Sequence, residues 1–127
     1  MLKNITLFAA EEKLAALIWR EAPLTSPELV ALAEKELDWK KSTTYTVLKK
    51  LCGKGVFKNV NANVSVVLSQ DDLIAHQSRH FVEDTFGGSL PKFITSFFSG
   101  KSLSPEQAAE LKRLIEEHEE LGGSDNG

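Results

Sequence analysis

The early part of the chain carries apolar residues at helical spacing. Within residues 9–20 these positions fall three and four apart, which predicts a first helix that ends before Pro23. A second helix is expected to begin at residues 25–28, Thr-Ser-Pro-Glu, a capping box in which the threonine or the serine is the cap. Its inner stripe consists of Leu29, Leu32, Ala33 and Leu37. Residues 38–39 connect it to a third helix, so two helices follow each other across a short turn.

The third helical segment, residues 40–51, has two chemically distinct faces, and Gly53 and Gly55 bracket its expected end. The apolar face consists of Thr44, Val47, Leu48 and Leu51. The opposite face is centred on Ser42, Thr46 and Lys49, with Tyr45 and Lys50 at its margins. Lysines neutralise phosphates and donate to guanine, hydroxyl groups address phosphates or base edges, and a threonine methyl can contact a thymine methyl. This face therefore has the groups that a helix reading a DNA groove needs.

After Gly55 the apolar pattern shortens to that of strands. Residues 56–60 and 64–68 are rich in valine, which predicts a β-hairpin, and Asn61 and Asn63 are expected to adopt the turn geometry that alanine resists. Three helices followed by a hairpin are the plan of a winged helix-turn-helix domain, in which the third helix is the recognition element. The expected fold is thus mainly α with a small β-hairpin.

Three further helices are expected after Ser69, which forms a capping box with Asp72. Together they carry five phenylalanines, more aromatic surface than a unit of about fifty residues can bury within itself. A homodimer with two-fold symmetry would cover this surface, whereas packing against the first half of the same chain is the alternative. The residues expected at the dimer interface are Phe81, Phe86, Leu90, Phe93, Ile94, Phe97, Phe98, Leu111 and Leu114.

The expected organisation is a winged helix-turn-helix domain at residues 1–68, a helical dimerisation region at residues 69–121 and a disordered tail at residues 122–127. Charge divides at the same place. Residues 1–68 hold ten Lys/Arg and seven Asp/Glu, a net charge of +3, whereas residues 69–127 hold five and eleven, a net charge of −6; the two sum to the chain's −3. Since a duplex repels an acidic surface, nucleic acid is expected to bind the first half.

Positive charge is concentrated further between Trp39 and Gln70, a stretch with six lysines and no acidic residue. The residues expected to contact double-stranded operator DNA are Lys41, Ser42, Thr43, Tyr45, Thr46, Lys49, Lys50 and Lys58. A solvated, lysine-rich surface helix would have the same composition. A winged-helix module that binds an acidic protein partner is a second alternative, and a regulator with an effector bound among the phenylalanines is a third.

Motifs of an enzyme, a cofactor site or a metal site are missing from the sequence. Cys52 is the one cysteine, and its place at the edge of the apolar face favours a packed thiol over a redox sensor. His76 and His80 stand one helical turn apart, but a closed zinc site needs more ligands, so solvated or packing histidines are favoured. No apolar run is long enough to insert into a membrane and no signal peptide is evident, which indicates a cytoplasmic protein.

Taken together, these residues resemble the penicillinase and methicillin-resistance repressors of the BlaI/MecI type, with which the CopY-type regulators are grouped. The matching segments are Trp19, Pro-Leu-Thr at residues 23–25, residues 39–51, Lys54-Gly55, Gly-Ser-Leu at residues 88–90, and Leu103-Ser104 before an acidic helix. The resemblance implies a homodimer with two winged helix-turn-helix heads on a helical dimerisation region. It also implies that the dimer binds a pseudo-palindromic operator and blocks transcription.

The resemblance further implies how such repressors are released. In the β-lactam-sensing relatives, a membrane metalloprotease system triggers cleavage of an Asn-Phe bond in the dimerisation region. The matching bond is Ser96–Phe97, in which the phenylalanine agrees and serine replaces asparagine; a regulatory protease is accordingly an implied partner. The copper-sensing relatives end in a cysteine cluster, which this chain lacks, so a copper response is not expected.

Overall fold

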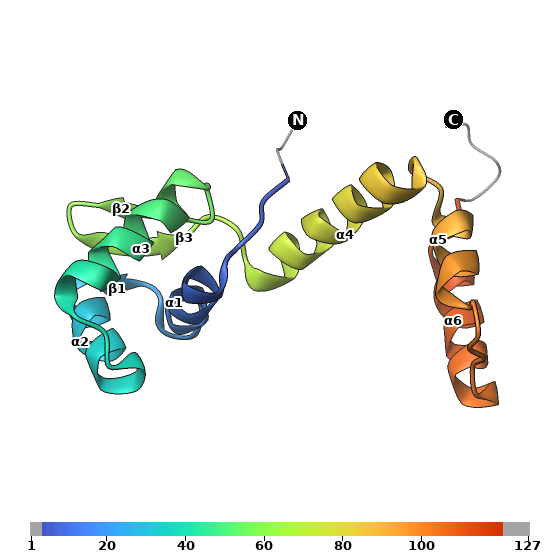
Figure 1. The fold of residues 1–127 in the computed structure, drawn as a ribbon, viewed down its shortest axis with the longest axis horizontal. Coiled ribbons are helices and arrows are strands. Elements are labelled where there is room, and N and C mark those ends of the chain that lie inside the picture. The colour runs from blue at the N-terminus through green and yellow to red at the C-terminus, as the bar shows by residue number, and fades with distance from the viewer. Residues whose placement is uncertain (1–3, 121–127) are drawn as a thin grey trace. The chain divides into compact units, whose positions relative to one another are not determined.

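The computed structural model describes residues 4–120 and divides after Gly88 into two compact units (Figure 1). The first unit contains α1 (Ala9–Glu21), β1 (Leu24–Thr25), α2 (Ser26–Leu37), α3 (Lys41–Gly53), β2 (Phe57–Val60), β3 (Asn63–Val66) and α4 (Gln70–Phe86). The second contains α5 (Leu90–Phe97) and α6 (Pro105–Glu117). The predicted winged helix-turn-helix arrangement followed by helices is confirmed. The tail predicted for residues 122–127 lies outside the described residues.

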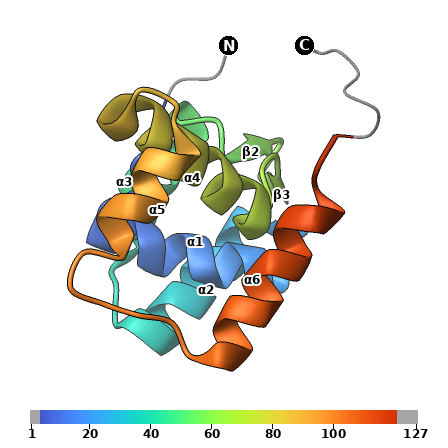
Figure 2. The ribbon, with the colours of Figure 1, turned by 90° about the vertical axis from the view of Figure 1, so that its right-hand side faces the viewer.

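The core of the first unit lies where α1, α2 and α3 meet the hairpin (Figures 1 and 2). Its largest fully buried side chains are Phe57, Leu14, Ile18, Leu29, Leu48, Leu51, Val56, Val64 and Thr44. Full burial of a leucine or valine side chain stabilises the fold by about 1.5–3 kcal/mol, so this set fixes the orientation of every helix that contributes to it. Trp19 packs at the margin, with its ring centroid 5.4 Å from that of Phe57.

The capping box at the start of α2 is confirmed, with Thr25 as its cap. The Thr25 hydroxyl accepts a hydrogen bond from the Glu28 N–H at 3.2 Å, and Glu28 Oε1 accepts one from the Thr25 N–H at 2.8 Å. Asp38 then adopts a left-handed conformation with φ 58° and ends α2. Only three residues separate α2 from α3, so the predicted helix-turn-helix forms.

The hairpin is part of a three-stranded antiparallel sheet with strand order β1-β3-β2. The expected turn was partly wrong, because the left-handed residues are Asn61 (φ 52°) and Ala62 (φ 64°), whereas Asn63 belongs to β3. A two-residue turn of this kind needs positive φ at both central positions, and the register imposes it on an alanine. The Ala62 carbonyl accepts a hydrogen bond from the Ser26 N–H at 2.8 Å, which ties the turn to α2.

Serines cap the later helices, and of the capping box predicted at Ser69 and Asp72 the serine cap is observed. Ser69 Oγ accepts a hydrogen bond from the Asp72 N–H at 3.0 Å at the start of α4, and Ser104 and Gln107 form a full capping box at the start of α6. In the second unit, α5 and α6 lie apart and are joined by residues 98–104 (Figure 2). None of its described residues, 89–120, is buried. Across residues 4–120, no helix combines the length and apolarity needed to cross a membrane.

Candidate nucleic-acid interface

The two faces of α3 are separated by burial as the sequence predicts. Thr44, Val47, Leu48 and Leu51 are all buried in the core. The hydroxyl and ammonium groups expected on the outer face are exposed at Lys41, Ser42, Thr43, Thr46, Lys49 and Lys50. Because the apolar face is held by the core, the outer face is presented to solvent in a fixed orientation.

Tyr45 is half-buried and differs from its neighbours on the outer face. Its hydroxyl lies 3.5 Å from Oγ of Ser26, a buried residue in the first turn of α2. Lys41 Nζ lies 6.0 Å from the centroid of the Tyr45 ring. The tyrosine therefore connects α3 to α2 and keeps Lys41 close to the helix surface, which suits an orienting residue as well as a DNA contact.

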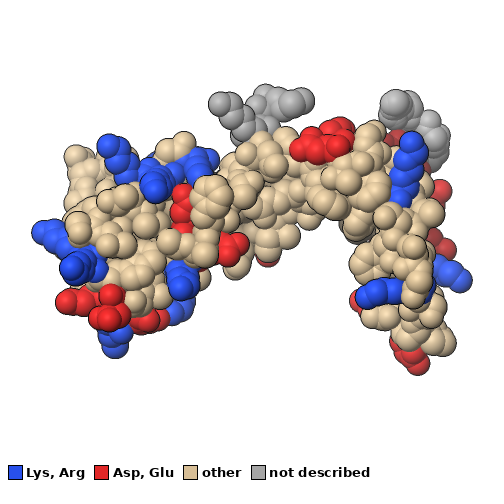
Figure 3. Space-filling view, in the orientation of Figure 1, with Lys and Arg blue, Asp and Glu red and all other residues tan. Residues whose placement is uncertain are grey.

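The six lysines of the acid-free stretch fall into two groups. Among the ion pairs of residues 4–120, none involves Lys40, Lys41, Lys49, Lys50 or Lys58. Lys54 instead places Nζ 2.6 Å from Glu11 Oε1, 2.6 Å from the Thr6 carbonyl oxygen and 4.5 Å from the centroid of the Phe8 ring. Figure 3 shows Lys and Arg side chains, in blue, beside both ends of α3. Five lysines therefore form no ion pair within the described residues, whereas Lys54 is bound to the fold.

Glu11, the partner of Lys54, is a buried carboxylate with only 3% of its surface exposed. Burial raises the pKa of Glu11, but hydrogen bonds from Lys54 and the Phe8 N–H, helped by the charges of Lys54 and Lys50, hold it below its usual range. The side chain is therefore ionised at neutral pH. Sequence reasoning missed this pair, because its members stand 43 positions apart and belong to no local motif.

The wing contributes one cation to the candidate surface. Lys58 on β2 is exposed and pairs across the sheet with Ser65, while the remaining exposed positions nearby include the apolar Val60, Val66 and Val67. The turn at Asn61 and Ala62 is also exposed. Contacts from the wing to a duplex would thus depend on Lys58 and on backbone or amide groups of the turn.

Cys52 and the histidine pair are at least partly buried. Cys52 is half-buried, and burial raises the pKa of its thiol, which is what a packed cysteine shows. His76 is buried and His80 half-buried, with ring centroids 4.5 Å apart. No group of three or more potential metal ligands forms within residues 4–120.

The residues predicted for dimerisation lie at the surface of the single chain to different degrees. Phe81, Leu90, Phe97 and Leu114 are exposed, whereas Phe86, Phe93, Ile94, Phe98 and Leu111 are partly buried. On α5 the ring of Phe97 stands 6.3 Å from that of Phe93 and 6.0 Å from that of Phe98. Ser96, the residue before the implied cleavage bond, is exposed on the same helix.

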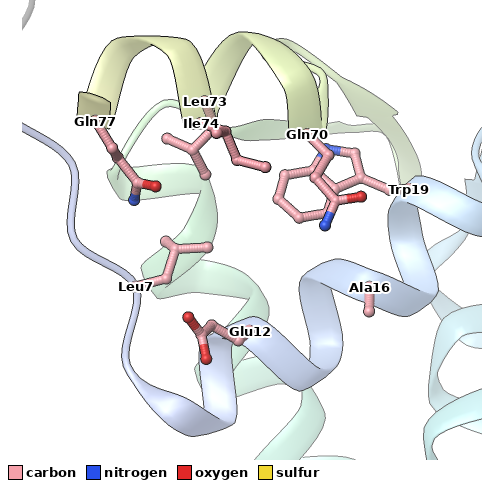
Figure 4. Close-up of a pocket in the computed structure, with 8 residues that line it drawn as sticks. All are labelled: Leu7, Glu12, Ala16, Trp19, Gln70, Leu73, Ile74 and Gln77. Carbon is pink, nitrogen blue, oxygen red and sulfur yellow. The ribbon is translucent and has the colours of Figure 1, made fainter. Parts of the chain in front are cut away.

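A cavity of about 220 Å³ lies between the N-terminal segment, α1 and α4 (Figure 4). Its lining residues are Leu7, Glu12, Ala16, Trp19, Gln70, Leu73, Ile74 and Gln77. Trp19 is held as one wall, since its Nε1–H donates to the Leu68 carbonyl oxygen at 2.9 Å. No phenylalanine lines this cavity. It is therefore not the effector site that the sequence analysis considered among the phenylalanines.

Two comparisons relate the sequence of this chain to known proteins. A family model described as penicillinase repressor matches residues 7–117. The chain is also 26% identical over 113 residues to the penicillinase repressor of Bacillus licheniformis, and the alignment covers 86% of this chain and 88% of that protein.

Proposed function

Because the chain belongs to the penicillinase repressor family, we propose that it represses transcription as a homodimer that binds a pseudo-palindromic operator through α3. Members of this family are repressors rather than enzymes, so the relevant chemistry is recognition of DNA. A symmetric dimer presents two α3 helices, and this symmetry matches two half-sites about one helical turn of DNA apart.

The two-faced α3 is the observation that carries the proposal. Its apolar face is buried, and its outer face presents hydroxyl groups and lysines that form no ion pair within the described residues. Phosphate contacts supply affinity, and hydrogen bonds to base edges supply sequence preference. The proposed DNA-contacting residues are Lys41, Ser42, Thr43, Tyr45, Thr46, Lys49 and Lys50 on α3, with Lys58 on the wing.

The proposal of a homodimer is supported by the second unit, which has no buried residue between 89 and 120. Helices as short as α5 and α6 are marginal in water without tertiary packing. An apolar face that meets its own copy across a two-fold axis would supply that packing. Dimerisation would also link two DNA-binding heads, so that the second binds at a raised effective concentration.

A regulatory protease is the remaining implied partner. The candidate bond, Ser96–Phe97, joins two exposed residues at the end of α5. A repressor of this kind would act in the cytoplasm, where operator DNA and the transcription machinery are found.

Gel-shift titration tests the proposal. A duplex carrying the promoter of the protein's own operon should be bound at lower protein concentration than a scrambled duplex of equal length. Salt should weaken the binding of both duplexes because counterions are released. Equal affinity for the two duplexes would instead favour an interaction module whose lysine face meets an acidic protein partner.

A further inference from the structure

The segment of residues 4–8, called the N-terminal strap below, is bound from two sides. From the C-cap of α3, Lys54 Nζ donates to the Thr6 carbonyl oxygen at 2.6 Å. From α4, Gln77 Nε2 donates to the neighbouring Ile5 carbonyl oxygen at 2.8 Å. The side chain of Ile5 is itself buried in the core. Consecutive carbonyl groups of one short segment therefore connect the end of α3 to α4.

Lys54 has its ammonium group turned entirely toward the strap and α1. Besides Thr6, it contacts the buried carboxylate of Glu11 and lies over the Phe8 ring. Glu11 also accepts a hydrogen bond from the Phe8 N–H at 2.8 Å, so the carboxylate and ammonium groups close a single network around the end of the strap. The charge of this ammonium group is therefore paired within the fold.

The network acts on α3 through the backbone of Lys54. Lys54 is the C-cap of the helix, and its own N–H donates to the Lys50 carbonyl oxygen at 3.0 Å. Lys50 precedes it by four residues and Lys49 by five, which is roughly one to one and a half helical turns. A shift at Lys54 would therefore displace the last turn of α3, which contains Lys50, and would disturb Lys49 directly before it.

We propose that Lys54 is a positioning residue for DNA binding: through the N-terminal strap it fixes the last turn of α3 relative to α1 and α4. The proposal rests on the proposed role of α3 as the DNA-reading helix. The strap fixes the end of α3 relative to α4, because Lys54 and Gln77 bind adjacent carbonyl groups of the strap. Figure 4 shows Gln77 on α4 and Leu7 on the strap at the same end of the cavity.

Salt dependence separates a positioning lysine from a phosphate-binding lysine. We expect Lys54→Met to weaken operator binding roughly 2- to 30-fold, the range for residues that act through a network. The slope of log affinity against log salt should stay at the parental value, because the long lysine side chains of α3 can still reach phosphates, whereas hydrogen bonds to base edges need the helix in its exact position. Lys49→Met, the matched variant, should lower the magnitude of that slope by about 0.9. A drop of that size in Lys54→Met, or parental affinity in that variant, would overturn the proposal.

A second variant addresses stability, since Lys54→Met leaves the Glu11 carboxylate buried beside no ammonium group. The double variant Glu11→Gln, Lys54→Met removes both charges and should regain part of the lost melting temperature. Its operator affinity should nevertheless stay reduced, because the Thr6 carbonyl contact is still missing. Recovery of parental affinity in the double variant would show that Lys54→Met weakens binding only through the unpaired Glu11 carboxylate, and would refute a positioning role.

The α4 side of the strap is tested without changing any charge. Gln77→Ala should speed hydrogen exchange of the amides in the last turn of α3 in DNA-free protein and lower operator affinity. Gln70→Ala, on the same helix but without a hydrogen bond to the strap, should do neither. Parental exchange and affinity in Gln77→Ala would contradict coupling through the strap. If Lys49→Met retains parental affinity and slope, the proposed role of α3 fails, and the exchange result still reports on the strap.

Discussion

At the scale of single residues, the two lysines near the end of α3, Lys49 and Lys50, give the most direct test of DNA recognition. Lys49→Ala or Lys50→Ala should weaken operator binding because each removes an exposed cation that forms no ion pair among residues 4–120. A phosphate-binding lysine would weaken all sequences alike and reduce the salt slope by roughly one, whereas a base-reading lysine would cost about 1–3 kcal/mol at one position. Competition gel shifts at several salt concentrations measure both quantities. Lys35→Ala on α2 is the control, and an equal response from all three variants would contradict the assignment.

Ala62 in the hairpin turn is a second informative residue. An L-residue in the left-handed region costs about 1–2 kcal/mol, and glycine avoids this cost while losing roughly 0.5–1 kcal/mol through its freer unfolded chain. Ala62→Gly should therefore raise the free energy of unfolding by about 0.5–1 kcal/mol in urea titrations. Ala31→Gly, at an exposed position within α2, should lower it by about 1 kcal/mol. A loss of stability in Ala62→Gly would mean that this alanine is not strained.

Glu11 predicts a specific dependence of stability on pH. Its folded-state pKa lies below the unfolded value of 4.5, so the contribution of its ionised form is fully present above pH 4.5 and is lost as pH falls through the folded-state pKa. Glu11→Gln should accordingly be less stable than the parent at neutral pH, and this difference should shrink below pH 4.5. Urea unfolding across that range gives the comparison. Glu12→Gln, at an exposed neighbour, is the control, and a difference that is constant with pH would contradict the prediction.

At the scale of elements, local patterns predicted the helices and missed what depends on distant partners. Apolar spacing and capping residues predicted the positions of α1, α2 and α3 to within about two residues, because these signals lie within one or two helical turns. Strand β1 has two residues, Leu24 and Thr25, and so shows no alternation; it exists because β3 offers it a partner. A strand that short could not have been recognised from the sequence.

The candidate interface shows the same division between local and tertiary signals. The two faces of α3 were predictable because periodicity alone separates Thr44 from Thr46. The diversion of Lys54 to Glu11 and the contact between Tyr45 and Ser26 depend on how α3 packs against α1 and α2. Lys54, one of the six lysines in the acid-free stretch, is therefore paired within the fold, which no local pattern could predict.

At the scale of the whole molecule, the exposed aromatic surface of α5 leads to a prediction about assembly. Phe97→Glu should convert the proposed dimer into monomers, because an unpaired carboxylate buried in an apolar interface costs several kcal/mol. Sedimentation measures the change. Val67→Glu, at a position 53% exposed against 56% for Phe97, is the matched control in the first unit and should remain dimeric.

Operator affinity of Phe97→Glu should fall by about 100-fold as the linked second head is lost. A parent protein that sediments as a monomer at micromolar concentration would contradict the proposed dimer.

Release of the repressor from its operator is the last property of the whole molecule that the structure makes testable. We expect that induction does not use efficient cleavage at Ser96–Phe97, because a protease site shaped for an asparagine amide leaves polar groups unpaired when serine is bound. The bond also lies in α5, where the N–H of Phe98 donates to the Ile94 carbonyl oxygen at 3.0 Å, so the helix must open before a protease can bind its backbone. The measurement is an immunoblot of the native host exposed to a β-lactam, followed by mass spectrometry of any fragment. Ser96→Asn is the matched variant and should be cleaved faster than the parent wherever such a protease acts. A parental fragment that ends at Ser96 and appears as fast as derepression would show instead that serine is accepted and that proteolytic induction extends to this chain.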